Sequence, residues 1–464
     1  MKVVLLTFVS AFHQNLIYIV TDGAGPAAFT LTRDYLSRNL FSEKFQVGSV
    51  ITHSADSYIT DSAAGATAFA CQTRTNNGFI GIDPNFVPIP SFLEAAKLKG
   101  YTTGVVLNND ITDATPASFY AHTRDRSYHD VIANQLVNGT EFGTTIDLII
   151  GGGIRHFIPQ TMKGSKRLDN VNLLEGAKEH GWRTVISSIQ EFWKLNKNTE
   201  LPLLAPLVMG DLPYEIDRPA HVPSLKDQVV KTLEIMENQN NKFVLLIESA
   251  RIDWAGHANS PAALVQEMIE FERMLVIVYE FASKYPNTLV ISTSDHETGG
   301  ITLGSTDHSP YRYFPHKLSS VKRSVEYISA ELIPLKLGIK ALHKELVKYL
   351  GFRLTTKELK LVYSGYLNTI STESYLFPWN IGEVLKERTE IGMSTHGHTA
   401  VDVPLFTFGN AKYRREHPLQ GTIHNHQLGN YIWNYLGLDY KKSKSLLRNQ
   451  ETRDPHGRPA VPEK

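Results

Sequence analysis

Several separated segments of the chain carry carboxylates and imidazoles at spacings that suit a divalent metal ion. Asp253 and His257 stand four residues apart, so one helical turn would direct both side chains to the same ion. Asp295 and His296 are adjacent after an apolar run, and His396-Gly397-His398 adds two further imidazoles. Each pair by itself is more often a chance pair of surface residues than a zinc site. Their combination in one chain predicts a metal centre.

A serine followed by small, helix-compatible residues could act as a nucleophile toward phosphorus. The segment is Thr60-Asp61-Ser62-Ala63-Ala64-Gly65-Ala66-Thr67-Ala68-Phe69, which predicts a helix that begins next to Ser62. Backbone N–H groups and the dipole at such a helix start can hold a phosphate against the hydroxyl. The simpler interpretation, an Asp-Ser pair that only caps a helix, is more frequent. No histidine of this segment is placed to deprotonate Ser62, so a metal ion or a distant base is required.

Short β-rich runs that alternate with helical patterns must position these residues. The runs cover residues 16–21, 103–107, 148–150, 242–247 and 288–293, and a long helix is expected over 260–279. Three of the runs lead into acidic residues, Asp22 and Glu248 directly and Asp295 after Ser294. In open α/β sheets, ligand sites form at the carboxyl ends of the strands. We therefore predict an α/β fold, with a mostly parallel central sheet and helices on both faces.

The length and composition are typical of a folded protein with one large catalytic domain, or at most about three domains. The chain has 464 residues, of which 42% are hydrophobic and 20% are charged. Residues 15–440 are interpreted as one α/β catalytic domain, and the lysine- and leucine-rich helical patterns of residues 303–390 as an insertion. Residues 441–464 are rich in Lys, Arg, Asn and Pro, which predicts a flexible tail.

The charge balance excludes a long-range electrostatic attraction to nucleic acid or anionic lipid. Lys plus Arg and Asp plus Glu both number 47, so the formal net charge is zero. No nucleic-acid partner is therefore indicated, and an anionic substrate needs a local cluster of positive charge. A single cysteine, Cys71, excludes an intrachain disulfide and is predicted to be a small buried helix residue.

Residues 1–14 combine a positive start with an apolar stretch that is too short to span a bilayer. This pattern indicates a signal peptide or the remnant of a signal anchor, and with it the secretory pathway or the extracellular space. The alternative is an amino terminus misassigned during gene prediction, because a second apolar run follows at residues 16–20. Asn138-Gly139-Thr140 would accept a glycan only if the chain enters the secretory pathway.

Six motifs in a fixed order make the chain similar to the alkaline phosphatases, and the motif sequences most resemble those of fungal, vacuolar-type members. They extend from residue 15 to about residue 410, and they are Thr21-Asp22-Gly23, Asp61-Ser62-Ala63-Ala64-Gly65-Ala66-Thr67-Ala68, Thr112-Asp113-Ala114-Thr115-Pro116-Ala117, residues 248–257, Ser294-Asp295-His296-Glu297-Thr298-Gly299-Gly300 and His396-Gly397-His398-Thr399-Ala400-Val401-Asp402. The resemblance implies hydrolysis of small-molecule phosphate monoesters with broad specificity for the alcohol. It also implies a homodimer. It adds the vacuolar lumen to the secretory pathway and the extracellular space as an expected location.

The resemblance further implies two Zn²⁺ ions and one Mg²⁺ ion. The implied ligands are Asp253, His257 and His398 for one zinc, Asp22, Asp295 and His296 for the second, and Asp22, Thr115 and Glu248 for magnesium. Imidazoles with carboxylates are suited to zinc, and an all-oxygen set is suited to magnesium. Zinc would lower the pKa of Ser62, so that its alkoxide attacks phosphorus and a phosphoserine forms. Arg126 stands where the family has the arginine that grips the phosphate.

Two positions bear on the rate and the metal preference rather than on the type of reaction. Trp254 follows a zinc ligand, where the family often has lysine or histidine, so a water-mediated contact to phosphate would be missing. Asp113 stands where family members have aspartate or histidine, and an aspartate favours tighter magnesium binding through a water molecule.

Two other functions compete with this interpretation. A phosphodiesterase or sulfatase relative would share the zinc-binding core, but the Asp61-Ser62-Ala63 motif with Thr115 and Glu248 fits monoesters better. A non-catalytic homologue that binds phosphate or a partner would be expected to have lost at least one ligand, whereas every ligand position and Ser62 are retained.

Overall fold

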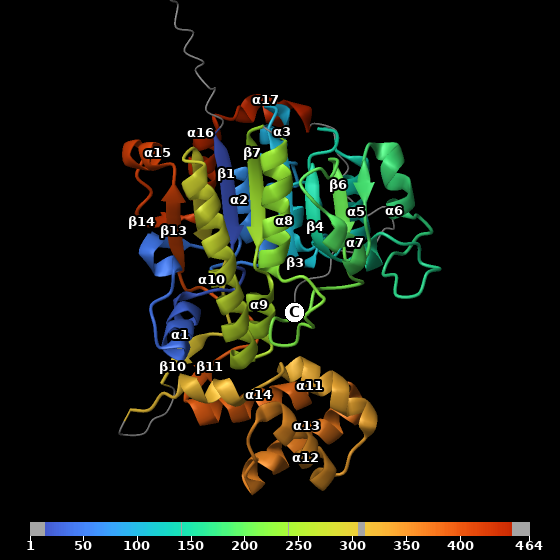
Figure 1. Ribbon diagram of the computed structural model, residues 1–464, viewed down its shortest axis with the longest axis vertical. Coiled ribbons are helices and arrows are strands. Elements are labelled where there is room, and N and C mark those ends of the chain that lie inside the picture. Colours follow the sequence, from blue (N-terminus) through green and yellow to red (C-terminus); the bar gives the residue numbers. More distant parts are fainter. Residues whose placement is uncertain (1–13, 141, 240, 305–310, 448–464) are drawn as a thin grey trace, which may run out of the picture.

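A ten-stranded sheet forms the centre of the molecule (Figure 1). The computed structural model describes residues 14–140, 142–239, 241–304 and 311–447. Within the described strands of this sheet, every neighbouring pair is parallel except the two pairs formed by β13, which confirms the predicted mostly parallel sheet. The strand order is β14 (Gly421–His424), β2 (Gln46–Ile51), β13 (Val403–Gly409), β8 (Thr288–Thr293), β1 (Asn15–Val20), β7 (Phe243–Glu248), β3 (Thr102–Asp110), β4 (Leu148–Gly152), β6 (Leu203–Pro206) and β5 (Thr184–Val185).

Apolar side chains of the strands point alternately to two cores, one on each face of the sheet. In β1, Ile17 and Ile19 join one core, whereas Leu16 and Tyr18 join the other. The first core is covered by α1 (Pro26–Leu36), α7 (Ile189–Lys194), α8 (Leu225–Asn238), α9 (Arg251–His257) and α10 (Pro261–Lys284). The second is covered by α2 (Ser62–Cys71), α3 (Phe92–Leu98), α4 (Ala114–Ala117), α5 (His129–Asn138), α6 (Leu173–Gly176) and α16 (Asn425–Leu436). The prediction of helices on both faces is confirmed.

The long helix expected over 260–279 is α10, which continues for five further residues to Lys284. Phe281 and Ala282 extend its apolar face, and the ring of Phe281 packs edge-on against Phe243 of β7. Pro286 stands two residues beyond Lys284 and disfavours helical backbone at the residue before it, so the helix ends there. Pro261 at the first turn suits the start of the helix, where its missing N–H costs nothing.

Residues 315–389, within the segment expected as an insertion, form a group of helices at one end of the molecule (Figure 1). Leu342, Leu346 and Leu350 recur every four residues, so one stripe of α12 is apolar and joins the core that α10 covers. The chain segments before and after this group pair as antiparallel strands, β10 (Ile301–Leu303) with β11 (Ile391–Met393). The elements are η4 (Pro315–Ser320), α11 (Val325–Leu332), η5 (Ile333–Leu335), α12 (Ile339–Leu350), α13 (Thr356–Thr372) and α14 (Leu376–Thr389).

The first residues of the predicted flexible tail are helical. Helix α17 (Tyr440–Leu446) is capped by the Asp439 carboxylate, which accepts from the N–H of Lys442, and Tyr440 packs against Trp433. The remainder of that tail, 448–464, lies outside the described residues, as do residues 1–13 of the predicted signal segment. Smaller elements are η1 (Ser42–Phe45), η2 (Ile154–His156), η3 (Ala177–His180), α15 (Ala411–Glu416) and the antiparallel pair β9 (Glu297–Thr298) with β12 (His398–Thr399).

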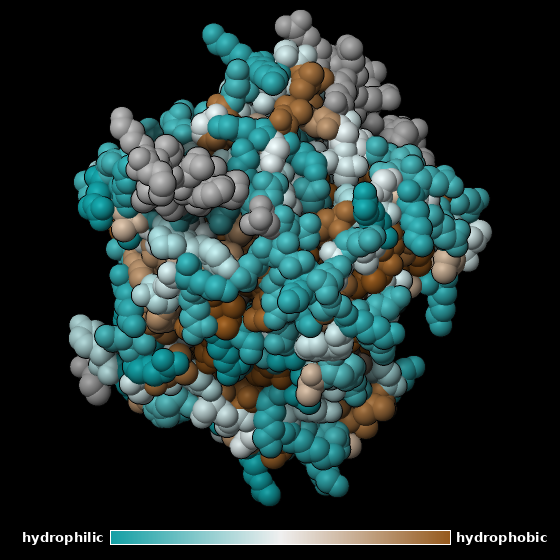
Figure 2. All heavy atoms as spheres, turned by 45° about the horizontal axis from the view of Figure 1, so that its top comes forward, coloured by the Kyte–Doolittle hydropathy of each residue, from teal (hydrophilic) through white to brown (hydrophobic). Residues whose placement is uncertain are grey.

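Cys71 is fully buried at the end of α2, as predicted. The face drawn in Figure 2 is mostly hydrophilic, with hydrophobic side chains in small groups between polar ones. Among the helices of the described residues, none has the length and apolar composition needed to cross a membrane.

Candidate active site

The carboxyl ends of three adjacent strands bring the predicted acidic residues to one edge of the sheet. Strand β1 lies between β7 and β8, and its last residue, Val20, pairs with Glu248 on one side and Thr293 on the other. Asp22 and Asp295 each follow their strand by two residues, so both reach the same edge as Glu248. This edge borders a cavity of ≈ 700 Å³ that is also lined by Ser62 and Arg126.

Ser62 occupies the first position of α2 and is almost fully buried. Asp61, the N-cap residue, has extended backbone, and its carboxylate accepts the N–H of Ala64 at 2.9 Å. This cap fixes the start of the helix, and so it fixes the serine that follows. The Ser62 hydroxyl lies 3.1 Å from Nε2 of His296, on the side of the acidic residues.

Backbone carbonyl oxygens fix the tautomers of the His257 and His398 rings. Nδ1 of His257 lies 2.6 Å from the carbonyl oxygen of His396, and Nδ1 of His398 lies 2.9 Å from that of Thr60. A carbonyl oxygen only accepts, so both Nδ1 atoms must donate, and a neutral ring then has no proton on Nε2. Burial and the nearby His296 ring lower the pKa of His398 to about 3, so this ring is neutral at physiological pH.

His296 follows the same pattern through a hydroxyl. The Thr298 hydroxyl donates to the carboxylate of Asp253 and therefore accepts from Nδ1 of His296 at 3.2 Å. Nε2 of His296 then faces the oxygens of Asp22 at 3.5 Å and of Asp295 at 3.2 Å. A donating Nδ1 that directs Nε2 toward the acidic residues is the arrangement found in metal-ligating histidines.

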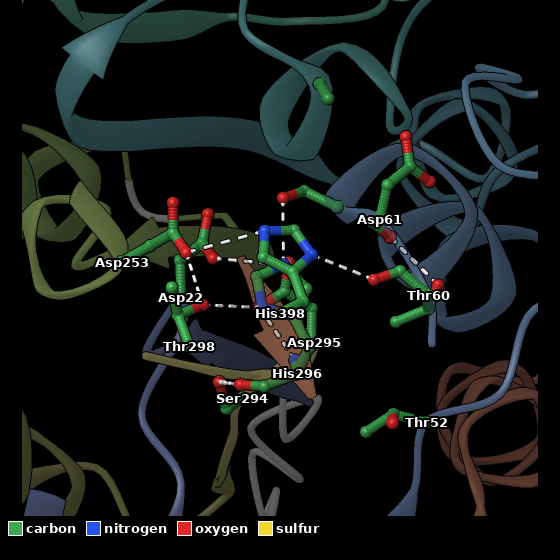
Figure 3. Close-up of polar contacts among 12 residues, drawn as sticks. Asp22, Thr52, Thr60, Asp61, Asp253, Ser294, Asp295, His296, Thr298 and His398 are labelled. Carbon is green, nitrogen blue, oxygen red and sulfur yellow. Dashed lines mark hydrogen bonds and ion pairs between the residues drawn. The ribbon is translucent and has the colours of Figure 1, made fainter. Parts of the chain in front are cut away.

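The predicted zinc ligands gather in two adjoining groups. In the first, the Nε2 atoms of His257 and His398 are 3.1 Å apart, and Asp253 lies 3.3 and 3.6 Å away. Burial lowers the pKa of His257, but the Asp253 carboxylate outweighs it and raises this pKa to about 9, so a cation at this position would replace a proton. In the second, Asp22 and His296 have ligand atoms within 4.8 Å of one another and of the shared Asp253, while the predicted ligand Asp295 has Oδ2 3.2 Å from Nε2 of His296. Figure 3 shows the His398 imidazole over that of His296, and the ring centroids are 3.5 Å apart.

Several buried oxygens at this edge have no hydrogen-bond partner among the described residues. They are Oδ1 of Asp22, Oδ2 of Asp295, both carboxylate oxygens of Glu248, and Oγ1 of Thr115. Burying such groups without partners is costly, and bound cations would remove that cost. Burial and then neighbouring carboxylates raise the pKa of both Asp22 and Glu248 well above the usual range. The donor set therefore fits divalent cations, with imidazoles and carboxylates for zinc and the oxygens of Asp22, Thr115 and Glu248 for magnesium.

Arg126 faces the same cavity from the loop before α5. Its guanidinium contacts the Asp61 carboxylate at 3.2 Å and that of Asp113 at 3.5 Å. Asp113 is in turn the N-cap of α4, which carries Thr115, and it accepts from the Asn109 amide at 2.7 Å. Two acidic partners on separate loops hold the planar guanidinium at the cavity, a group whose geometry suits an oxyanion.

Trp254 lines the cavity beside the outer ligand group and is 42% exposed. Its ring is 5.3 Å from the Arg251 guanidinium, which also lies 4.0 Å from the ring of Tyr214. An indole offers one N–H and no charge, so this position contributes no cation to the cavity.

The sequence predicted no individual role for three residues of the recognised motifs. Asp61 orients both the nucleophile segment and Arg126, and Thr298 links His296 to Asp253. His396 is not turned toward the ligand groups, because its own Nδ1 bonds to the carbonyl of His257 at 2.8 Å. Sequence spacing carries no signal for these roles, because each one depends on a contact between distant segments.

The fold and the site together define an α/β enzyme with a buried serine beside carboxylate and imidazole clusters at the carboxyl edge of its sheet. The chain belongs to the alkaline phosphatase family, whose model matches residues 13–438. It is 35% identical to the repressible alkaline phosphatase of Saccharomyces cerevisiae, an alignment that covers 95% of this chain and 84% of the yeast protein. Hydrolysis of phosphate monoesters is therefore its reaction class, and the resemblance to fungal members is confirmed.

Solved alkaline phosphatases share this fold. The cold-active enzyme of the psychrophile Shewanella sp. is 26% identical with a TM-score of 0.79, over 91% of this chain and 99% of that one. A variant of the enzyme from the Antarctic bacterium TAB5, described with Mg bound in its M3 site, is 26% identical with a TM-score of 0.65, over 92% and 99% of the chains.

Proposed function

We propose that this enzyme hydrolyses phosphate monoesters with the help of bound metal ions and through a phosphoserine on Ser62. The observation that carries the proposal is the set of buried oxygens without a hydrogen-bond partner among the described residues, together with the imidazole Nε2 atoms that gather beside the Ser62 hydroxyl. Such a set is unfavourable without cations and suited to binding them.

The metal sites of the proposal use the residues described above. Zinc would be held by Asp253, His257 and His398 in one group and by Asp22, Asp295 and His296 in the other. Magnesium would be held by Asp22, Thr115 and Glu248, with Asp113 acting through a water molecule. The TAB5 variant with bound Mg supports a magnesium site in a related fold.

In the proposed reaction, Arg126 and the N–H groups at the start of α2 bind the non-bridging oxygens of the phosphoryl group. The Ser62 hydroxyl loses its proton as its oxygen attacks phosphorus in line, the bond to the substrate oxygen breaks, and the leaving oxygen takes up a proton and departs as the alcohol. Water then attacks the phosphoserine, which releases inorganic phosphate and restores the Ser62 hydroxyl. The bound metals would supply Lewis acidity, which lowers the pKa of the attacking hydroxyl and stabilises negative charge on the leaving oxygen.

In this proposal Arg126 and the start of α2 would contact only the phosphoryl group, so we propose small-molecule monoesters with broad specificity for the alcohol. A homodimer and a location in the secretory pathway, the vacuolar lumen or the extracellular space remain predictions from the family resemblance and residues 1–14.

Steady-state hydrolysis of an aryl phosphate tests metal dependence directly. Activity should be lost on treatment with a zinc chelator and should return when Zn²⁺ and Mg²⁺ are added back. A matched aryl phosphodiester in the same assay should be hydrolysed far more slowly. Full activity in the presence of the chelator would contradict the metal requirement, and faster diester hydrolysis would contradict the monoester assignment.

The nucleophile is tested by trapping. After mixing with labelled substrate and quenching in acid, the parent enzyme should carry label, and Ser62→Ala should carry none while its zinc content stays at the parent level. Label on the Ala variant would overturn the assignment of Ser62.

A further inference from the structure

His396 and the zinc-ligand candidate His257 are joined by two reciprocal hydrogen bonds. Nδ1 of His396 donates to the carbonyl oxygen of His257 at 2.8 Å, and Nδ1 of His257 donates to the carbonyl oxygen of His396 at 2.6 Å. The carbonyl of His257 is among the last of α9, which have no partner within their own helix. The His396 side chain therefore holds the backbone of His257, while the His396 backbone sets the tautomer of the His257 ring.

The ring of His396 is itself held by a helix of the 315–389 group. Trp379 of α14 stacks on His396 with ring centroids 4.2 Å apart and an interplanar angle of 21°. Tyr375 stacks on the Trp379 ring at 6.2 Å. Close packing extends along the helix, because a Cβ on Gly382 would lie 2.7 Å from the carbonyl oxygen of Asn259, two residues beyond His257. Helix α14 thus lies directly against the end of α9.

His257 needs such support more than the other imidazoles do. Its side chain is 38% exposed, compared with 13% for His398 and 0% for His296. The ring stands on the last turn of a seven-residue helix, where solvent reaches part of it. Outer contacts that orient a ligand typically change metal affinity about 10- to 100-fold when they are removed.

We propose that Trp379 and His396 are positioning residues for His257, and that through them the helices of residues 315–389 set the zinc affinity of the outer ligand group. This inference rests on the proposed function, since it assumes that Asp253, His257 and His398 bind zinc.

A purely structural role for the stack would have a different consequence. Residues 395–397 are already tied to Gly299 by backbone hydrogen bonds, from Gly299 to Gly397 at 3.0 Å and from Thr395 to Gly299 at 3.3 Å. Loss of the Trp379 ring should therefore leave the loop closed. If the stack only added packing energy, its removal would lower the temperature of unfolding and leave zinc affinity unchanged.

The test measures zinc binding to the metal-stripped full-length chain by competition with a chromophoric chelator. Trp379→Leu and His396→Ala should each weaken one bound zinc by about 10-fold or more, while Trp379→Phe, which keeps an aromatic face, should stay near the parent. Trp193→Leu is the matched control. This tryptophan is 43% exposed on α7, outside the cavity lining, and its loss should leave zinc affinity unchanged.

The outcomes separate this inference from the proposed function. If the parent chain binds no zinc, or if His398→Asn binds as much as the parent, the assignment of the outer ligands fails. If the parent binds zinc and both Trp379→Leu and His396→Ala bind it equally tightly, the positioning inference is overturned. Should Trp379→Leu not fold, as judged by circular dichroism, His396→Ala carries the test because it alters only a loop residue.

Discussion

The two ligand groups of the site use the same residue types but are supported differently. The inner group, Asp22, Asp295 and His296, has side chains that are 8%, 0% and 0% exposed, and its members follow adjacent strands of the central sheet. The outer group is Asp253, His257 and His398, and the side chains of its two histidines are 38% and 13% exposed. These two come from the short helix α9 and the two-residue strand β12.

This difference indicates which ligand group can change its metal affinity without loss of the whole site. The inner group is fixed by a sheet that is buried on both faces, so a change there affects the whole edge. The outer group is held by loop and helix contacts, so its affinity for metal depends on neighbours such as His396. We therefore expect substitutions in the inner group to be severe and those around the outer group to be graded.

The largest expected effect is that of Asp295→Asn in the inner group. The substitution keeps the shape but removes the charge of a fully buried carboxylate whose Oδ2 has no hydrogen-bond partner among the described residues. Activity should fall by more than about 100-fold, beyond the range typical for outer contacts, and added zinc should not restore it. Metal content by elemental analysis and the maximal rate would be measured together. Near-parent activity would show that the inner group does not hold a catalytic metal.

The matched change in the outer group is His398→Asn, which can retain the hydrogen bond to the Thr60 carbonyl and removes Nε2. Zinc stoichiometry and activity should fall together, by about 10- to 100-fold in zinc affinity, and excess zinc should restore part of the activity. Unchanged metal content would show that the ligand set is wrong. A loss as complete as that of Asp295→Asn would remove the contrast between the two groups.

A smaller effect is expected at the rim of the outer group. Trp254 carries no charge, so Trp254→Lys should attract the phosphate product, with a gain of about 1 kcal/mol or roughly fivefold in affinity, because water screens the new charge. The phosphate inhibition constant should fall and, where release of phosphate limits turnover, the maximal rate should fall too. The comparison is made at one pH with fixed zinc and magnesium. No gain in phosphate binding would mean that this position acts only through packing.

An effect on stability rather than on activity lies outside both groups, in the stacked imidazoles of His129 and His156. Burial, followed by the charge of Arg155, lowers the pKa of His156 to about 4. The unfolded chain, with a histidine pKa near ~6.5, then binds more protons than the folded chain between pH 6.5 and 4, so stability falls as the pH falls through this window. The contribution is on the order of 2 kcal/mol.

This pH dependence is measured by denaturant unfolding of the chelator-treated protein, which separates it from acid release of metals. His156→Gln should show a shallower loss of stability than the parent between pH 6.5 and 4. Parallel curves for the two proteins would contradict the assignment of this loss to His156.

Local sequence determined the strands and the chemistry of the site. Runs of apolar β-formers ending in Asp22, Glu248 and Asp295 predicted both the parallel sheet and the edge where its ligands meet, because parallel strands place their carboxyl ends together. The small residues after Ser62 predicted the helix that starts at the serine. Family resemblance, rather than spacing, supplied the division of ligands among individual ions.

Only the tertiary structure decided which contacts hold those side chains. Asp61 meets Arg126 from 65 positions away, and Thr298 meets Asp253 from 45. The stack of Trp379 on His396 joins a helix of the 315–389 group to the site. Periodicity and composition report the face that a residue buries, but a hydrogen bond or a ring stack depends on the relative placement of whole elements. That placement is set by the packing of the complete core.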